Sequence, residues 1–266
     1  MLEKTFSIIG QGFIFPRHIQ AIASIGGKFV DIISDSRYDK DWVGMIDTTK
    51  ANYVVVLTPN DLHFEMILRA VEKGKIVLCE KPLTIDTSEV KRFLNSDKVF
   101  TVLQLRHHPL AKQLKEQIKP SEDYKIEMDI SVFRDKDYFT GWKGDEQRSG
   151  GILYNLGIHY FDLLLWLFGE AEKVQTDFLG EKLASGAIEG KNYRCEWRIC
   201  SNAPKDRQQR TFKINGIDYN FSSQDNLSFE DLHKFVYQDL IQGKGITTRE
   251  ALKSMELIEK IKNEKV

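Results

Sequence analysis

The strongest constraint on the fold of this chain is a series of short apolar runs, each closed by a glycine or a polar residue. In the first hundred residues these runs are Phe6–Ile9, Phe29–Ile33, Tyr53–Leu57, Ile76–Cys79 and Val99–Leu103. Between them, segments such as Pro16–Ile25 and Asp61–Lys73 carry apolar residues at helical spacing. Apolar strands that alternate with helices predict a parallel sheet covered on both faces, which is an α/β fold.

The second half of the chain has a different pattern. Tyr124–Phe133 alternates apolar and polar residues, as a half-exposed antiparallel strand does, and Gly151–Phe168 predicts a strongly apolar helix. Further strand-like runs follow at Val174–Phe178, Tyr193–Cys200, Arg210–Ile214 and Ile217–Phe221. A helix-rich tail covers about residues 229–262 and breaks at Gly243–Gly245. The order is therefore α/β first and α+β second, and we place the domains at residues 1–108 and 109–266.

Composition excludes several classes of function. The 266 residues are 41% hydrophobic and 29% charged with a formal net charge of −1, so nothing favours nucleic acid or an anionic membrane as a partner. The three cysteines lack the spacing of a zinc or redox site, so we predict no metal and a reduced, cytoplasmic protein. The first apolar run is too short for a signal peptide, and no stretch approaches the roughly 20 apolar residues of a membrane span.

A glycine turn after the first strand is the first candidate site. Gly10-Gln-Gly12 allows a tight turn and a close approach to a pyrophosphate at the start of the next helix, although Phe15 replaces the third glycine of the dinucleotide fingerprint. Asp35, at the end of the next strand, is placed to accept hydrogen bonds from an adenosine ribose, which favours NAD over NADP. NADP stays open because Ser34, Ser36 and Arg37 can contact a 2′-phosphate. The cofactor-binding residues predicted here are Gly10, Gly12, Phe13, Ile14 and Asp35.

Two further polar loops follow the next two strands. Thr58-Pro59-Asn60, with His63, is either a helix cap or the lining of the nicotinamide half of a cofactor site. Glu80-Lys81-Pro82 places a lysine at the carboxyl end of a buried strand, where ligands of parallel sheets bind. The Lys81 ammonium can stabilise an alkoxide as a hydride leaves, whereas most lysines are simply solvated. We expect Thr58, Pro59, Asn60, His63, Glu80 and Lys81 to contact the cofactor.

A fourth candidate lies in the apolar helix of the second half. Asn155 and His159 are four residues apart, so they share one face of a helix. A histidine can take the proton of a hydroxyl group as hydride departs, although a histidine in such an apolar helix is more often a core residue bonded to a carbonyl.

Together these stretches resemble the Gfo/Idh/MocA oxidoreductase family over nearly the whole chain. The resemblance rests on Gly10-Gln-Gly12 with His18, Thr58-Pro59-Asn60 with His63, Glu80-Lys81-Pro82, and Gly150-Gly151 followed by Asn155, His159 and Asp162. It implies a Rossmann domain that binds NAD, followed by a domain with an open-faced, mainly antiparallel sheet, and a homodimer or homotetramer built through those sheets. It also implies catalytic roles for Lys81, His159 and Asn155, and asparagine replaces the aspartate that many members carry.

Within the family, the sequence is most similar to the WlbA/WbpB-type sugar-nucleotide 3-dehydrogenases, which act on UDP-N-acetylglucosaminuronic acid in the assembly of bacterial surface polysaccharides. The stretches 103–109, 141–146, 149–162 and 210–221 carry this likeness. It implies a nucleotide-sugar substrate, bound by Lys81, Gln104, Arg106, His108, Trp142, Lys143, Arg148, Asn155 and His159. The chain departs from the family between Asp35 and Tyr53, where a helix and another strand are usual.

The sequence leaves three functions to compare. We favour NAD-dependent oxidation of the 3-hydroxyl of a nucleotide-linked amino sugar or uronic acid to a 3-keto sugar. The alternative is a dehydrogenase or reductase of a free sugar, inositol or another polyol. A cofactor-binding regulator without turnover is disfavoured because Lys81 and His159 are both retained, and a methyltransferase would explain neither residue.

Overall fold

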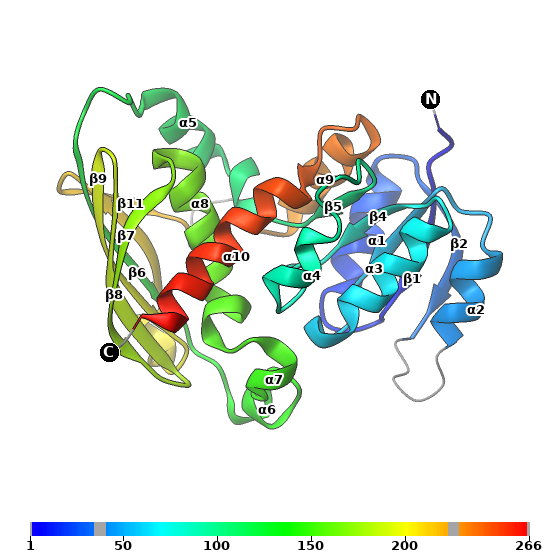
Figure 1. The fold of residues 1–266 in the computed structure, drawn as a ribbon, viewed down its shortest axis with the longest axis horizontal. Helices are drawn as coiled ribbons and strands as arrows, with labels where there is room; N and C mark the ends of the chain where they lie inside the picture. Colours follow the sequence, from blue (N-terminus) through cyan, green and yellow to red (C-terminus); the bar gives the residue numbers. More distant parts are fainter. Residues whose placement is uncertain (1, 35–40, 223–228, 265–266) are drawn as a thin grey trace. The chain divides into compact units, whose positions relative to one another are not determined.

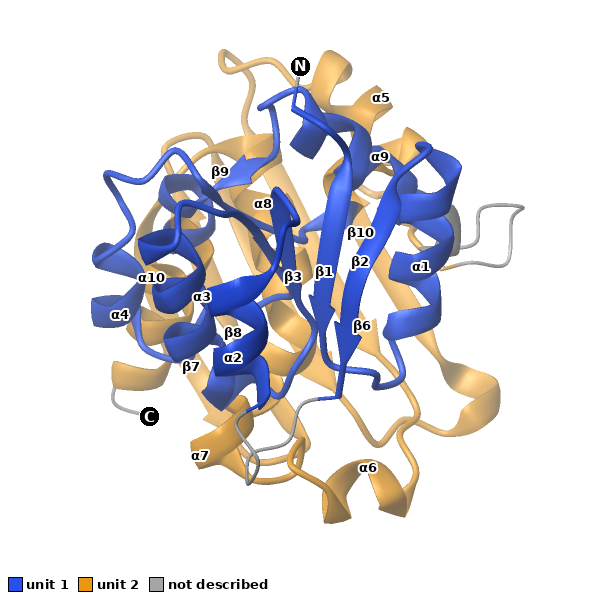
Figure 2. Ribbon diagram, turned by 90° about the vertical axis from the view of Figure 1, so that its right-hand side faces the viewer, with its two compact units in different colours: residues 1–104, 229–252 blue, residues 105–228, 253–266 orange. Residues whose placement is uncertain are grey.

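The computed structural model describes residues 2–34, 41–222 and 229–264 and divides into two compact units. The first unit contains residues 1–104 and 229–252, and the second contains residues 105–228 and 253–266 (Figures 1 and 2). A segment near the carboxyl end of the chain therefore belongs to the first unit. The domain boundary at residues 108 and 109 stays a prediction of the sequence.

The first unit is built on a mostly parallel sheet. Its strands are β1 (Thr5–Ile9), β2 (Lys28–Ile33), β3 (Tyr53–Val56), β4 (Ile76–Cys79), β5 (Val99–Thr101) and β12 (Ile246–Thr247). They lie in the order β12-β5-β4-β3-β1-β2, and only β12 runs antiparallel to its neighbour. Every residue of β3 is buried, as expected for a strand covered on both faces. The five predicted apolar runs therefore became the five parallel strands.

Helices pack on the two faces of this sheet. They are α1 (Phe15–Ser24), α2 (Asp41–Thr48), α3 (His63–Glu72) after a short 3₁₀ turn (Asn60–Leu62), α4 (Thr87–Lys91) and α9 (Phe229–Ile241). α1 packs against α9, whereas α3 packs against α2, β3 and β4. Figure 2 shows α1 and α9 on one side of the strands and α2 and α3 on the other.

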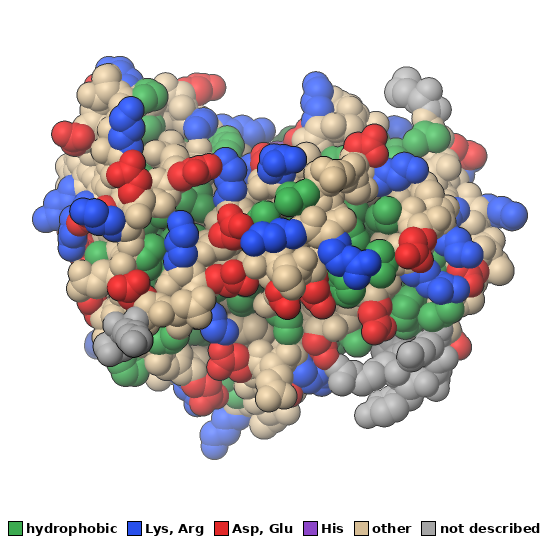
Figure 3. Space-filling view, viewed as in Figure 1, with side chains coloured by type: hydrophobic (Ala, Val, Ile, Leu, Met, Phe, Trp, Pro, Cys, Tyr) green, Lys and Arg blue, Asp and Glu red, His purple; other side chains and the backbone are tan. Residues whose placement is uncertain are grey.

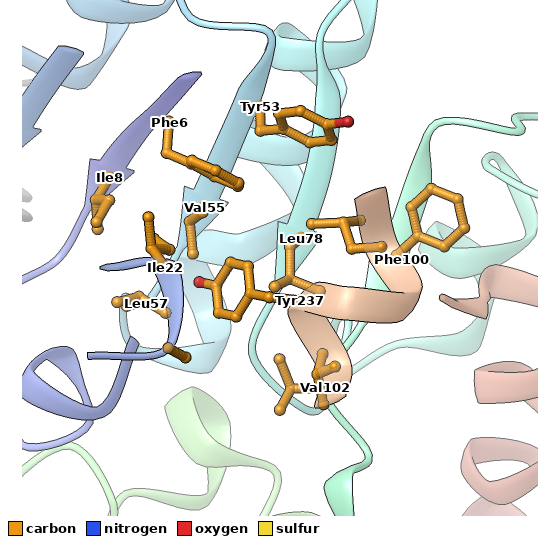
Figure 4. Close-up of a cluster of buried hydrophobic side chains, with 13 residues drawn as sticks. Phe6, Ile8, Ile22, Tyr53, Val55, Leu57, Leu78, Phe100, Val102 and Tyr237 are labelled. Atoms are coloured by element: carbon orange, nitrogen blue, oxygen red, sulfur yellow. The ribbon is translucent and has the colours of Figure 1, made fainter. Parts of the chain in front are cut away.

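The core beneath α1 and α9 joins residues that are far apart in the chain (Figure 4). The Phe6 ring stacks on Tyr53 at 4.9 Å between centroids and meets the edge of Tyr237 at 5.7 Å. All three side chains are almost completely buried. Burial of one large apolar side chain contributes about 1.5–3 kcal/mol, so α9 is held to the sheet by its own apolar residues.

β2 forms the edge of this sheet. Among the described residues between β2 and β3 there is one helix, α2, and no further strand. Apolar side chains of this edge strand are partly uncovered: Phe29 is 38% exposed, Val30 41% and Ile32 38%. Asp35, the predicted ribose ligand, lies outside the described residues.

The second unit contains a mixed sheet. Its strands are β6 (Tyr124–Ser131), β7 (Ala171–Leu179), β8 (Leu183–Gly190), β9 (Tyr193–Cys200), β10 (Gln209–Ile214) and β11 (Ile217–Asn220). Their order is β11-β10-β6-β9-β8-β7, and only the β6–β9 pair is parallel. The prediction of β6 as an antiparallel strand therefore holds for its pairing with β10 and is wrong for its pairing with β9. β8 has no counterpart among the predicted strands.

One face of this sheet is covered by the apolar helix α8 (Ile158–Phe168). Phe161 meets the edge of Trp197 at 5.3 Å, and Phe168 contacts Tyr193 at 5.7 Å. The other face carries charged ladders, in which Arg194 pairs with Glu189 and Glu196. The remaining helices of the unit are α5 (Pro109–Gln117), α6 (Lys136–Thr140), α7 (Glu146–Ser149) and the carboxyl-terminal turns of α10 (Thr248–Asn263).

The stretch Glu146–Phe168 is long and apolar enough to cross a membrane by length and composition. The expectation that no stretch reaches that length is therefore wrong, because α7 and the turn after it extend the predicted helix. Within the protein 67% of its most apolar window is buried, which is typical of a core helix. Positive and negative side chains are interspersed on the face drawn in Figure 3.

Candidate active site

The carboxyl ends of three parallel strands form one row in the first unit. Ile9 of β1 is in register with Val56 of β3, and Val56 is in register with Cys79 of β4. The next residues along each strand are Gly10, the Leu57–Thr58 pair and Glu80. The sheet therefore brings together the glycine turn, the Thr58 loop and the Glu80-Lys81 pair, as the sequence predicts.

The glycine turn has two glycines with different roles. Gly10 has a φ of +102°, and a Cβ placed on it would lie 2.6 Å from the Leu57 carbonyl oxygen, so only glycine fits. Gly12 does not have the positive φ of Gly10, and a Cβ placed on it would meet nothing within 4 Å. Its glycine is therefore not required by packing against the protein.

The turn leads directly into α1, whose first residues have no side-chain cap. The N–H groups of Phe15 and Arg17 donate to the Gly12 and Ile14 carbonyl oxygens at 3.1 Å, and Pro16 has no N–H, so what the helix start offers an anion is the positive end of its dipole. Together with the open surface at Gly12, this arrangement fits a dinucleotide pyrophosphate. Phe13 is 80% exposed at the same turn, with the Arg17 guanidinium over its ring at 5.5 Å, and Ile14 occupies the cap position.

The Thr58 loop is held by a buried histidine. His63 lies with Nδ1 2.7 Å from the Pro82 carbonyl oxygen and Nε2 2.9 Å from the Thr58 carbonyl oxygen. Both ring nitrogens therefore face protein carbonyls, and His63 joins the loop after β3 to the loop after β4. Thr58 and Asn60 are themselves almost fully buried. A direct contact of His63 with the cofactor stays a prediction, and its evident structural role is to position Thr58, Pro59 and Pro82.

Glu80 is a buried carboxylate with several donors. His18 Nε2 lies 2.9 Å from its Oε1, and the backbone N–H of Lys81 donates to its Oε2 at 3.2 Å. Burial alone would raise the pKa of Glu80, but the hydrogen bond with His18 and the nearby ring of His233 outweigh it and hold the pKa well below its usual value. Glu80 is thus an internal anion, and its carboxylate forms hydrogen bonds within the protein.

In the second unit, the predicted glycine pair starts an unusual helix. Gly150 has a φ of +80°, and a Cβ there would lie 2.6 Å from the Tyr154 ring. The helix then begins with a π turn, Leu153–Gly157, before continuing as α8. π turns inside helices occur frequently at functional sites. Asn155 lies in this turn and His159 in the first turn of α8, and both side chains are half-buried.

A pocket of about 280 Å³ adjoins this π turn. Asn155 lines it and donates its Nδ2 hydrogen bond to the Lys143 carbonyl oxygen at 3.1 Å. The lining also includes Arg134, Tyr138, Phe139, Lys143, Glu146, Glu181 and Lys262. Three cations and two aromatic rings against two carboxylates suit an anionic, ring-containing ligand. Sequence reasoning missed Arg134, Tyr138 and Lys262. The basic and aromatic residues around 134–143 are a sequence signal for Arg134 and Tyr138 but not for Lys262.

Two residues predicted as substrate contacts form hydrogen bonds with other residues of the second unit. Arg106 forms two hydrogen bonds with the buried carboxylate of Asp162, at 2.9 and 2.7 Å, and so ties the turn before α5 to α8. His108 caps α5, because its Nδ1 accepts a hydrogen bond from the Leu110 N–H at 3.2 Å. These bonds give both residues structural roles, and contact with substrate stays a prediction for them.

The other predicted substrate residues lie in three places. Gln104 is the last residue of the first unit's amino-terminal segment, on a 3₁₀ turn. Trp142 and Lys143 are adjacent, with the Lys143 ammonium 5.7 Å from the Trp142 ring and 5.2 Å from the Tyr138 ring. Arg148 lies on α7 outside the pocket lining. Only Lys143 and Asn155 of the predicted substrate set line the pocket.

Comparison with known proteins identifies the family. Residues 4–98 match the Gfo/Idh/MocA oxidoreductase family's NAD-binding Rossmann fold, and residues 115–199 match its C-terminal alpha/beta domain. The chain belongs to the Gfo/Idh/MocA oxidoreductase family. The predicted family, fold class and NAD cofactor are thereby confirmed.

Individual relatives point to more than one substrate. The putative oxidoreductase YteT of Bacillus subtilis is 24% identical over 64% of this chain and 41% of its own length. The inositol 2-dehydrogenase of Rhizobium meliloti is 28% identical over 62% of this chain and 55% of its own length. The chain thus spans about half the length of these curated relatives. The WlbA (WbpB) dehydrogenase of Thermus thermophilus, solved with NAD and UDP-GlcNAcA, is 29% identical with a TM-score of 0.84, covering 95% of this chain and 92% of that one.

The two glycines of the cofactor turn predict opposite phenotypes. Gly10→Ala forces a Cβ into the Leu57 carbonyl at a positive φ, so we expect a loss of about 1–3 kcal/mol of unfolding free energy. Gly12→Ala meets no protein atom, so its stability stays unchanged while NAD binding weakens. Urea unfolding and calorimetric NAD titration measure the two effects. Equal destabilisation by both substitutions would contradict this assignment.

The Arg106–Asp162 pair predicts a large, non-additive effect on stability. Arg106→Ala leaves a carboxylate that is 2% exposed without its partner, so unfolding free energy falls by about 3–5 kcal/mol. Asp162→Ala has a similar effect, and the double variant loses much less than the sum of the two. Urea denaturation of the four proteins gives the coupling, and simple additivity would show that the pair is not coupled.

Buried histidines predict that acid destabilises the protein. Burial lowers the pKa of His18, His63 and His108 from the usual 6.5. The unfolded chain therefore binds protons more readily than the folded protein just below pH 6.5, and unfolding free energy falls as pH drops through that range. The depressed pKa of Glu80 adds a further loss below its usual 4.5. Urea unfolding at pH 7.5, 5.5 and 4.5 measures this trend, and constant stability would contradict it.

Proposed function

We propose that this protein uses NAD to oxidise the 3-hydroxyl of a nucleotide-linked amino sugar or uronic acid to a 3-keto sugar. The observation that carries the proposal is the pocket beside the π turn, where Asn155 shares a surface with Arg134, Lys143 and Lys262. Lys262 pairs with Glu146 of the same lining at 2.7 Å, so Arg134 and Lys143 are the cations that a phosphate or uronic carboxylate would use, and a neutral polyol gives no reason for them. The likeness to the Thermus thermophilus enzyme solved with NAD and UDP-GlcNAcA supports the same class of substrate.

NAD supplies the hydride acceptor when it is bound at the glycine turn of the first unit. Lys81, held at the carboxyl end of β4, steadies the substrate oxygen as negative charge develops on it. His159 accepts the hydroxyl proton. The carboxamide of Asn155 cannot take up a proton at this step. Asn155 instead orients the Lys143 loop, through the hydrogen bond that its Nδ2 donates to the Lys143 carbonyl oxygen. Lys143, on its aromatic supports, binds the anionic part of the substrate.

The alternative substrate is a free sugar, inositol or related polyol. The relatives named inositol 2-dehydrogenase in Rhizobium meliloti and myo-inositol 2-dehydrogenase in Thermotoga maritima, at 28% and 27% identity, support it. The two functions differ in their response to UDP without a sugar. Binding of UDP to the folded protein raises its melting temperature only if a nucleotide site is present.

Turnover of a substrate panel tests the proposal. We expect NADH absorbance and a keto-sugar product with UDP-N-acetylhexosamines or their uronic acids. Lys81→Met lowers kcat by about 10²–10³-fold, because the stabilising charge is lost. Lys143→Met raises KM for the nucleotide sugar more than it lowers kcat. Lys119→Met, at a side chain that is 68% exposed, is the matched control and leaves both constants unchanged. Turnover of inositol alone, or of no compound while NAD binds, would refute the proposal.

A further inference from the structure

We infer that Tyr237, His18 and His233 are positioning residues that fix the Glu80 carboxylate and, through it, the backbone of Lys81. The inference rests on the proposed function for the chemistry of Lys81. It assigns a role to α9, whose residues lie more than a hundred positions after the glycine turn and carry none of the sequence motifs. The four side chains all belong to the first unit.

The contacts form a continuous chain of hydrogen bonds. The Tyr237 hydroxyl lies 2.7 Å from His18 Nδ1, and His18 Nε2 lies 2.9 Å from Glu80 Oε1. The other carboxylate oxygen, Oε2, accepts the backbone N–H of Lys81 at 3.2 Å. Tyr237 and His18 are fully buried, and the Glu80 side chain is 13% exposed. Each link therefore lies in a site of low dielectric, where hydrogen bonds hold their geometry most strongly.

Only one direction of these bonds satisfies every member. Burial raises the pKa of the Tyr237 hydroxyl well above its usual value, so Tyr237 is neutral and donates its O–H. Burial lowers the pKa of His18, so its neutral ring accepts at Nδ1 and donates from Nε2. Glu80 accepts at both oxygens. The order of donation therefore runs from Tyr237 to His18 to Glu80.

His233 completes the surroundings of the carboxylate. It is fully buried, its ring meets the edge of the His18 ring at 4.9 Å, and its Nε2 lies 3.8 Å from Glu80 Oε1. Neither of its ring nitrogens has a hydrogen-bond partner among the described residues. α1, β4 and α9 thus each contribute to holding one anion.

One ring nitrogen of His18, one of His233 and one carboxylate oxygen of Glu80 lie within 4.8 Å of one another. They form a set that a divalent cation would use. A cation and the positioning role require opposite tautomers of His18. A metal needs the lone pair of Nε2, which places the proton on Nδ1. The positioning role needs the proton on Nε2, as donor to Glu80.

Kinetics of matched variants test the positioning role. Tyr237→Phe removes the first donor, and we expect kcat to fall about tenfold while KM for NAD and for the sugar changes less than about twofold. His18→Asn, which cannot reach Glu80, has the same effect, whereas His18→Gln keeps a donor near the Nε2 position and restores most of kcat. Tyr53→Phe is the control, because it also removes a hydroxyl from this core. Tyr53 begins β3, in register with the first residue of β4, whereas Glu80 follows the last residue of β4.

A measurement that needs no substrate keeps this inference separate from the proposed function. ¹⁵N NMR of the histidine-labelled protein is expected to show His18 protonated at Nε2, with a shift in Tyr237→Phe and none in Tyr53→Phe. If no nucleotide sugar is turned over, the proposed function fails, and the NMR result still decides the positioning role. Protonation at Nδ1, a stoichiometric metal in the purified protein, or full kcat in both Tyr237→Phe and His18→Asn would each overturn it.

Discussion

The cost of burying the ionised carboxylate of Glu80 governs the organisation of the first unit. A carboxylate that leaves water is stable only when donors surround it. The donors come from His18 of α1 and from the backbone N–H of Lys81 after β4, and α9 places the His233 ring 3.8 Å from the carboxylate. Since Lys81 follows Glu80 directly, the arrangement that satisfies the anion also fixes where the lysine side chain begins. The row formed by β1, β3 and β4 then places the glycine turn and the Thr58 loop beside it.

Much of the first unit is predictable because its signals are local. Strands covered on both faces appear as continuous apolar runs, and all five predicted runs became parallel strands. The glycine turn and the residues after β4 are recognisable from adjacent residues alone. His233 and Tyr237 are not, because what defines them is a contact with Glu80 and His18 across more than 150 positions. Periodicity marks such residues only as the apolar face of a helix.

The second unit contains structural roles that residue type alone does not reveal. Arg106 and His108 are chemically suited to bind an anion, yet one pairs with a buried carboxylate and the other caps a helix. β8 escaped prediction because it contains two glycines and two alanines and only one β-branched residue, Ile188. Gly186 is required there, since a Cβ would lie 2.1 Å from the Gln175 carbonyl oxygen and 3.1 Å from the Trp197 ring. The need for a small residue arises from neighbouring strands and leaves no local trace.

The origin of α9 has a consequence for how the protein is made. Residues 229–252 belong to the first unit, although the ribosome adds them only after almost all of the second. While the chain is growing, the parallel sheet exists without the side chains of Val236, Tyr237 and Leu240, which complete its core. During that interval the sheet face that α1 and α9 share lacks α9, and Glu80 lacks the neighbouring ring of His233. Assembly of the nucleotide-binding half therefore waits for residues that follow almost all of the second unit, even though most of its sequence is read first.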